Sequence, residues 1–171
     1  MNKHVVSLAL ATALSAGVAS AQSTFEALLS SLNETSPNGS PATGIGIVVL
    51  NAAQNQITVD ESWSGLLASA TASHIHGPGG VGTNAGFIFA FSGVPAATSG
   101  SIPQQVFAIT PTQVAYLESG YLYMNIHTSL FPGGEIRGQL VLVPEPSTAA
   151  LLVLGSGATI LALRRRKVSH H

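Results

Sequence analysis

Polar and apolar side chains alternate along residues 121–128, and no other feature of the chain constrains its fold as strongly. A β-strand turns successive side chains to opposite faces, so a period of two gives one polar and one apolar face. The polar face comprises Tyr121, Tyr123, Asn125 and His127, and the apolar face comprises Leu122, Met124 and Ile126. Residues 135–142 repeat this split after a Pro-Gly-Gly turn, which predicts a hairpin that pairs Asn125 with Arg137.

Short β-patterned runs, separated by glycine and proline, continue through residues 22–143. We expect strands at residues 44–50, 56–63, 73–76, 86–91, 100–109, 121–128 and 135–143. Residues 24–32 fit either a strand or a helical stripe, and we expect a strand. Thr110, Pro111 and Gln113 predict the start of a short helix that closes at Gly120. The pattern predicts an all-β domain, a Greek-key-like antiparallel β-sandwich with one short connecting helix.

Three phenylalanines lie within the expected strand 86–91. Phe87, Phe89 and Phe91 alternate with Ile88 and Ala90, so both faces of the strand are apolar. Strands that are buried on both faces have this composition. We therefore expect a central strand and not a platform on which sugars stack.

An uncharged, mostly apolar run covers residues 148–163 and precedes the basic residues 164–167. As a helix this run would reach roughly 24 Å, a little less than a hydrocarbon core of about 30 Å, so it predicts a marginal transmembrane helix. The basic end favours the cytoplasmic side, which places the preceding chain outside. A buried core helix with a basic tail is the alternative, but a soluble helix would have a polar face.

The N-terminal residues 1–21 have the pattern of a secretory signal peptide. Lys3 precedes an apolar stretch over residues 5–18, and Ala19-Ser20-Ala21 is a small-x-small site for signal peptidase. We therefore expect the mature protein to begin at Gln22 and its exported domain to cover residues 22–143.

The order of elements at the C-terminus resembles the PEP-CTERM sorting signal of Gram-negative bacteria that make extracellular polysaccharide. The resemblance covers residues 144–167 and rests on Pro144, Glu145 and Pro146, the apolar run, and the cations Arg164, Arg165 and Arg166. It implies that an exosortase, a membrane transpeptidase-like enzyme, cuts the chain near Pro-Glu-Pro. The protein would be held in the inner membrane by its C-terminal helix, transiently or stably, and then reach the cell surface or the extracellular matrix.

The exported domain is acidic. It contains one cation, Arg137, and six acidic residues, so its net charge is −5 with histidine neutral. Phosphate binding needs several cations, which argues against nucleic acid or anionic lipid as a partner. The chain has no cysteine, so the domain depends on packing or on a ligand for its stability.

Three histidines are the candidate metal ligands of the domain. His74 and His76 occupy one face of an expected strand with Ile75 turned inward, and His127 lies on the polar face of residues 121–128. Three neutral imidazoles suffice for an open zinc or copper site. The alternative is structural, with each histidine bonded to a carbonyl or a carboxylate that fastens a loop.

Arg137 is the expected centre of a structural polar network. It is the sole cation of the domain and lies near Glu135 in sequence and opposite Asn125 in the predicted hairpin. A guanidinium can grip a carboxylate through two parallel hydrogen bonds, so we expect a bidentate carboxylate network that ties the strands together. A role in holding an anionic ligand is the alternative.

Several motifs in the middle of the chain resemble the CHRD domain, which is named from chordin and is widespread in bacterial secreted proteins. The resemblance spans roughly residues 24–143, and Ser73 stands where the family usually has alanine. The motifs are Phe25, Asn33-Glu34, Ser64-Gly65-Leu66, Ser73-His74-Ile75-His76-Gly77-Pro78, residues 120–128 and Gly134-Glu135-Ile136-Arg137-Gly138-Gln139-Leu140. The resemblance implies an extracellular β-sandwich and supplies no catalytic residues.

Two hypotheses about function follow. The first is a non-enzymatic exported domain in adhesion, matrix organisation or ligand binding, with extracellular polysaccharide or surface proteins as partners, because the sequence offers no set of nucleophile, base and orienting group. The second is a zinc-binding or copper-binding module, which copper would make redox-active. Ligation needs neutral imidazole, so metal binding should weaken as the pH falls through about 6.5.

Overall fold

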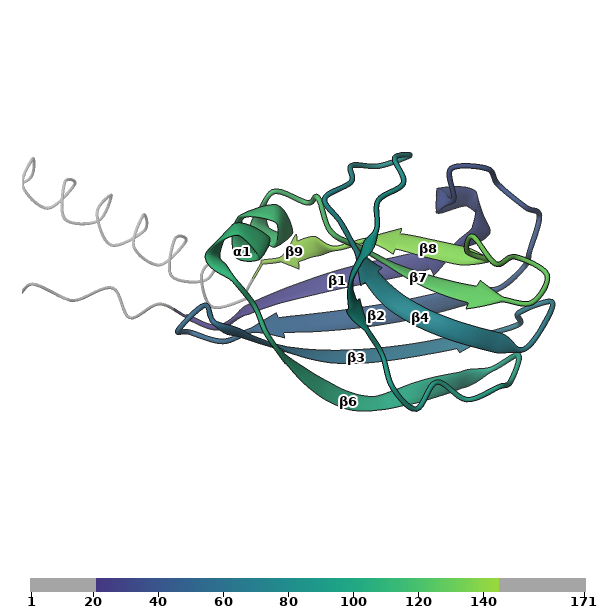
Figure 1. The fold of residues 1–171 in the computed structure, drawn as a ribbon, viewed down its shortest axis with the longest axis horizontal. Helices are drawn as coiled ribbons and strands as arrows, with labels where there is room; N and C mark the ends of the chain where they lie inside the picture. The colour runs from purple at the N-terminus through teal and green to yellow at the C-terminus, as the bar shows by residue number, and fades with distance from the viewer. Residues whose placement is uncertain (1–20, 145–171) are drawn as a thin grey trace, which may run out of the picture.

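The computed structural model describes residues 21–144, which form nine strands, one α-helix and one short 3-10 helix (Figure 1). The strands are β1 (Ser23–Ser30), β2 (Thr43–Leu50), β3 (Gln56–Ser64), β4 (Ala70–His76), β5 (Phe87–Ala90), β6 (Gly100–Ala108), β7 (Tyr123–Thr128), β8 (Ile136–Gln139) and β9 (Val141–Val143). The helices are α1 (Pro111–Glu118) and the 3-10 turn Ser31–Asn33. The predicted transmembrane run 148–163 and residues 1–20 of the predicted signal peptide lie outside the described residues.

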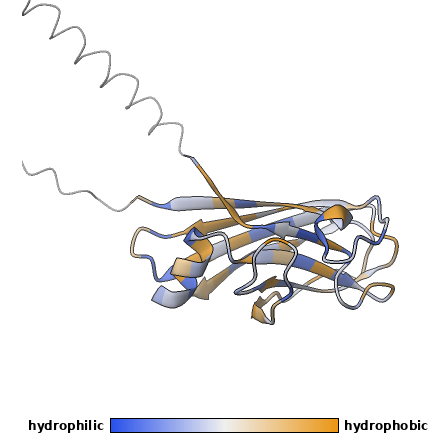
Figure 2. Ribbon diagram, turned by 90° about the horizontal axis from the view of Figure 1, so that it is seen from above, coloured by the Kyte–Doolittle hydropathy of each residue, from blue (hydrophilic) through white to orange (hydrophobic). Residues whose placement is uncertain are grey.

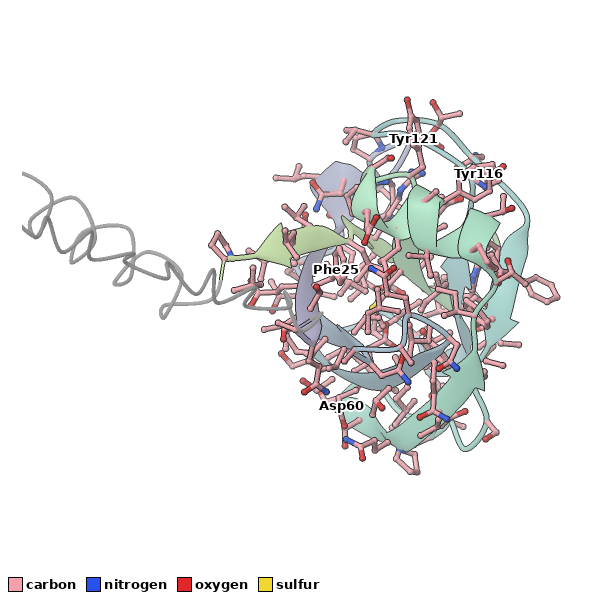
Figure 3. The ribbon with its side chains drawn as sticks, turned by 90° about the vertical axis from the view of Figure 1, so that its left-hand side faces the viewer. Phe25, Asp60, Tyr116 and Tyr121 are labelled. Atoms are coloured by element: carbon pink, nitrogen blue, oxygen red, sulfur yellow. The ribbon has the colours of Figure 1, made fainter. Side chains whose placement is uncertain are left out.

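All strand pairings in this part of the chain are antiparallel, in the order β5-β4-β7-β8-β1-β2-β3-β6, with β9 also paired to β1. The sheet curls, and Figure 3, which looks along the strands, shows them surrounding the core side chains. β1 pairs with β2 over its whole length, and it also pairs with β8 through Ser30 and Arg137 and with β9 through residues 24–26. The predicted all-β antiparallel fold with one connecting helix is confirmed.

The curled sheet encloses the core. Apolar and polar residues alternate along the strands, and this alternation decides which side chains point into the core (Figure 2). In β1, Phe25, Ala27 and Leu29 are at most 2 % exposed, whereas Leu28 is 64 % exposed. The helical stripe that residues 24–32 also fit would have needed Leu28 and Leu29 on the same buried face. Residues 21–144 therefore contain a complete core of their own, as an independently folding domain requires.

Helix α1 joins β6 to β7 and begins as the sequence predicts. Thr110 Oγ1 accepts from the Gln113 backbone N–H at 3.3 Å, and the Gln113 side chain accepts from the Thr110 backbone N–H at 2.9 Å. This reciprocal pair caps the first turn. Gly120 follows the helix with φ +72°, a left-handed conformation that glycine adopts without steric cost.

Two expectations about strands need correction. The phenylalanine strand is not central: β5 is at the end of the strand order, and Phe87 is 61 % exposed while Phe89 is buried. Phe87 stacks on the His74 ring, and among the described residues β4 is the one strand that pairs with β5. The expected strand 135–143 also divides at Leu140, whose N–H donates to Leu122 O, into β8 and β9.

The polar face of β7 and β8 is not open to solvent. The hairpin forms as predicted, with Asn125 opposite Arg137, but Tyr123, Asn125 and Arg137 are each at most 2 % exposed. Residues 77–86 lie across this face and bind it through hydrogen bonds such as that from Arg137 to Gly80 O. The candidate site therefore lies under loops that come from other parts of the chain.

Candidate metal site

His74, His76 and His127 converge on one point. Strands β4 and β7 are neighbours, with His74 opposite Asn125 and Ala72 opposite His127. One ring nitrogen from each histidine lies within 4.8 Å of the others, and Nε2 of His76 is 3.3 Å from Nε2 of His127. The structure thus brings together all three histidines that the sequence identifies as candidate ligands.

Main-chain carbonyls fix the orientation of two of the rings. Nδ1 of His76 lies 2.9 Å from Ala85 O, and Nδ1 of His127 lies 2.9 Å from Pro132 O. A carbonyl oxygen only accepts, so each Nδ1 carries the hydrogen. In the neutral rings the Nε2 atoms then present lone pairs toward each other, which is how histidine ligands are held in metal sites.

The spacing of these two atoms matches a shared metal ion. Two imidazole nitrogens bound tetrahedrally at about 2.0–2.1 Å from zinc lie about 3.3 Å apart. The observed Nε2–Nε2 distance is 3.3 Å. Without a cation or a proton between them, two lone pairs at this distance repel. Nδ1 of His74 is buried and has no hydrogen-bond partner, so this nitrogen is also free to bind a metal ion.

All three imidazoles favour the neutral form that metal ligation needs. Burial, together with the neighbouring His127 and His76, lowers the pKa of His74 to about 4. Burial also lowers the pKa of His76 and of His127, although the Ala85 and Pro132 carbonyls oppose this in each case. The cluster is therefore uncharged at neutral pH and ready to receive a cation.

Aromatic rings pack against the histidine cluster. Phe87 stacks on His74 with ring centroids 4.7 Å apart, and Tyr123 stacks on His76 with centroids 5.0 Å apart and planes 10° from parallel. The Tyr123 hydroxyl lies 2.9 Å from the Ala85 N–H and accepts from it. The same residue of the loop therefore holds both Tyr123 and His76.

Arg137 lies behind this stack, and its surroundings differ from the expectation. Its guanidinium carbon is 3.4 Å from the centroid of the Tyr123 ring, a cation–π contact. Within residues 21–144, its side-chain hydrogen bonds go to Gly80 O, Thr83 O and Asn84 Oδ1, none of which is a carboxylate. The expected bidentate carboxylate network is thus replaced by an anchor for loop 77–86.

Glu135 serves a separate network. Its two carboxylate oxygens accept from the Ser40 hydroxyl at 2.7 Å, the Leu67 N–H at 2.7 Å and the Thr128 hydroxyl at 2.8 Å. The carboxylate that responds to Arg137 is instead Glu34. Burial raises the pKa of Glu34 to about 7, while the charge of Arg137 and the side chain of Asn125 oppose the rise.

The sorting residues are described only at their start. Pro144 follows β9 directly, whereas Glu145, Pro146 and the cations Arg164, Arg165 and Arg166 lie outside the described residues, as does Ala19 of the predicted cleavage site. Within residues 21–144, no helix is both long and apolar enough to cross a membrane.

Comparison with known families decides the identity of the domain. The family model of the CHRD domain matches residues 25–140. The chain belongs to the CHRD family. A second family model, the PEP-CTERM protein-sorting motif, matches residues 142–167 of this CHRD protein, and this motif implies export, processing by an exosortase and sorting to the cell surface. No curated protein and no solved structure matches the chain.

Sequence reasoning about the CHRD domain missed the groups that orient the ligands. The carbonyls of Ala85 and Pro132 belong to the main chain, so no residue type indicates them. The alternation along residues 121–128 indicates Tyr123 only as one member of a polar face. One signal in the sequence could have indicated the cover: Arg137, the sole cation of the domain, lies opposite the polar face of residues 121–128 and needs partners there.

Proposed function

We propose that the exported CHRD domain binds a transition metal ion, Zn²⁺ or copper, through His74, His76 and His127. The observation that carries this proposal is the 3.3 Å separation of the His76 and His127 Nε2 atoms, each on a ring whose Nδ1 hydrogen is bound by a carbonyl. Neutral imidazoles without a carboxylate suit zinc or copper and do not suit calcium or magnesium, which take oxygen ligands.

The proposed role is binding and not turnover, at the cell surface or in the extracellular matrix. The PEP-CTERM motif supports this location. We further propose that residues 148–163 hold the chain in the inner membrane before processing, and that the released domain acts in adhesion or matrix organisation through polysaccharide or surface proteins. Three ligands leave a coordination position for a donor from such a partner.

The test is metal uptake by residues 22–144 produced without an affinity tag, because a polyhistidine tag would supply the same donors. We expect one equivalent of zinc or copper at pH 7.5. The double variant His74→Ala, His127→Ala should lose about 100-fold or more in affinity, because it keeps one of three ligands. Phe87→Leu is the matched control, since it removes a stacked ring but no donor atom, and it should keep the metal. No uptake, or equal uptake by the double variant, would disprove the proposal.

A further inference from the structure

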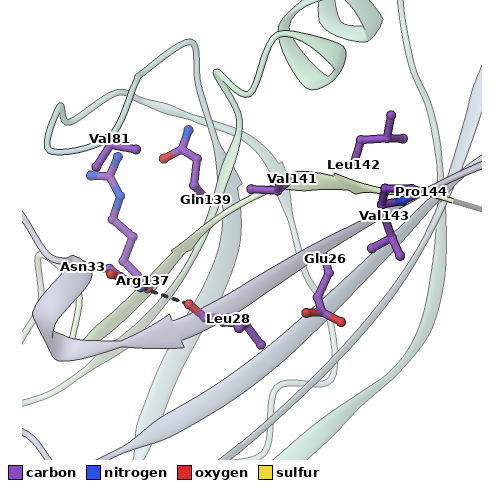
Figure 4. A pocket seen from close by; sticks show the side chains of 10 residues that line it. All are labelled: Glu26, Leu28, Asn33, Val81, Arg137, Gln139, Val141, Leu142, Val143 and Pro144. Carbon is purple, nitrogen blue, oxygen red and sulfur yellow. Dashed lines mark hydrogen bonds between the residues drawn. The ribbon is translucent and has the colours of Figure 1, made fainter.

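An exposed apolar groove of about 400 Å³ lies along β9, at the end of the described chain (Figure 4). Large apolar side chains in it are open to solvent: Leu28 is 64 % exposed, Val81 85 % and Val141 61 %. Glu26, Asn33, Arg137 and Gln139 contribute polar groups to its lining. The residues that line it are Glu26, Leu28, Asn33, Val81, Arg137, Gln139, Val141, Leu142, Val143 and Pro144.

The groove and the sorting motif share residues. The match to the PEP-CTERM motif begins at residue 142, so Leu142, Val143 and Pro144 belong to both. At this point the chain is still part of the folded domain, because Leu142 pairs with Phe25 and Val143 pairs with Thr24 of β1. No linker separates the beginning of the motif from the wall of the domain.

We propose that this groove is a docking surface for the membrane-bound sorting enzyme that processes the PEP-CTERM motif. An enzyme that holds the chain around residues 142–146 necessarily approaches Leu28 of β1 and Val81 of loop 77–86, which line the same groove. Burial of their exposed side chains against an apolar partner would stabilise the complex. The folded domain thus contributes to recognition of its own sorting signal.

The geometry of β9 fits recognition of an extended segment. Within the described residues β9 pairs with β1 along one edge only, so its other edge keeps main-chain groups that can pair with an added strand. Its three side chains are all exposed, at 61 %, 53 % and 38 % for Val141, Leu142 and Val143. A partner can therefore read both the backbone and the side chains without unfolding the core.

The experiment measures C-terminal processing of the full chain in cells that contain the sorting system, by mass analysis of the surface protein. The variants Leu28→Thr and Val81→Thr change the groove outside the motif. We expect each to lower the rate of processing about five-fold, which corresponds to about 1 kcal/mol of lost binding. Val106→Thr is the matched control, because Val106 is 55 % exposed on β6 and does not line the groove, and it should be processed normally.

Each outcome decides the proposal. Thermal unfolding of both variants should match that of the parent, because both side chains are exposed. Normal processing of Leu28→Thr and Val81→Thr would refute the docking surface. A lipid surface is the competing occupant. If residues 22–144 bind phosphatidylethanolamine–phosphatidylglycerol vesicles through Leu28 and Val81 while processing is unchanged, the groove serves lipid and the proposal is wrong. The parent and the Leu28→Thr and Val81→Thr variants of residues 22–144 should take up equal amounts of zinc, so a failure of this test is distinguishable from a failure of metal binding.

Discussion

Two ionisable side chains, Glu61 and Arg137, are buried in different regions of the molecule, and they differ in their hydrogen-bond partners and in their charge. Glu61 of β3 lies in the apolar core, 3 % exposed, and its Oε1 has no hydrogen-bond partner. Arg137 lies under loop 77–86, 1 % exposed, with three oxygen partners and the Tyr123 ring. Burial in the apolar core favours the neutral form of Glu61. On the loop-covered face, which is the polar face of β7 and β8 under loop 77–86, carbonyl and amide oxygens directed at Arg137 stabilise its positive charge. Loop 77–86 therefore holds polar side chains in fixed orientations on the loop-covered face, whereas the apolar core around Glu61 does not.

Hydrogen bonding in the core agrees with a neutral Glu61. Ser73 Oγ lies 2.6 Å from Glu61 Oε2 and 3.2 Å from Asn125 O, but one hydroxyl has only one hydrogen to donate. A protonated Glu61 that donates to Ser73, which in turn donates to Asn125 O, satisfies both contacts. Burial raises the pKa of Glu61 to about 8, although a hydrogen bond donated by Ser73 to the ionised carboxylate would oppose this rise.

The substitution Glu61→Gln should give the largest effect. The unfolded carboxyl ionises near pH 4.5 and the folded one near pH 8, so the unfolded state binds fewer protons between these values and stability falls as the pH rises. Each pH unit in this window costs about 1.4 kcal/mol, which amounts to about 4 kcal/mol at pH 7.5. Glutamine cannot ionise, so the variant should be more stable than the parent by up to this amount in urea unfolding at pH 7.5.

The stability difference between Glu61→Gln and the parent should depend on pH. The advantage of Glu61→Gln should vanish below pH 4.5, where both states of the parent are protonated. An advantage that is equal at pH 4 and pH 7.5 would mean that packing, and not proton binding, causes it. A destabilised variant at pH 7.5 would show that the core holds Glu61 as a carboxylate, which would remove the contrast with Arg137.

The substitution Arg137→Met tests the other region. It removes the anchor of loop 77–86, whose Ala85 carbonyl orients His76, so we expect zinc affinity to fall about 10-fold to 100-fold. The pKa of His76 should rise as well, because the charge of Arg137 contributes to lowering it. Tyr123→Phe keeps the ring under the guanidinium and should cost less affinity. If Arg137→Met lowers stability but leaves both the zinc affinity and the pH midpoint of binding unchanged, Arg137 is purely structural.

Many features of the fold could be predicted from the sequence because one physical rule governs them. Alternation with period two gives the buried set of β1 and places His74 and His76 on one face, and the Thr110 capping box is a local motif. The cover over β7 and β8 could not be predicted. Loop 77–86 has no periodicity, and its contribution to the site is made by main-chain carbonyls, which leave no trace in residue type.

The smallest predicted effect concerns pH. Three histidines with the ordinary pKa of 6.5 would lose about six-fold in zinc affinity between pH 7.5 and pH 6.5, since each ring is about one-tenth protonated at pH 7.5 and half protonated at pH 6.5. Here the pKa of each is lowered, so isothermal titration should show little change over this range and a loss only at lower pH. This replaces the sequence-based expectation of a decline through about 6.5. A six-fold loss between pH 7.5 and pH 6.5 would mean that the rings are more solvated than their burial under loop 77–86 implies.

Zinc K-edge X-ray absorption on tag-free residues 22–144, loaded with one equivalent of zinc at pH 7.5, tests the central claim most directly. The account predicts a first shell of four light ligands at about 2.0–2.1 Å, with the outer-shell scattering of three imidazoles. A shell of six oxygen ligands, or fewer than two imidazoles, would contradict the claim that His74, His76 and His127 form a metal site.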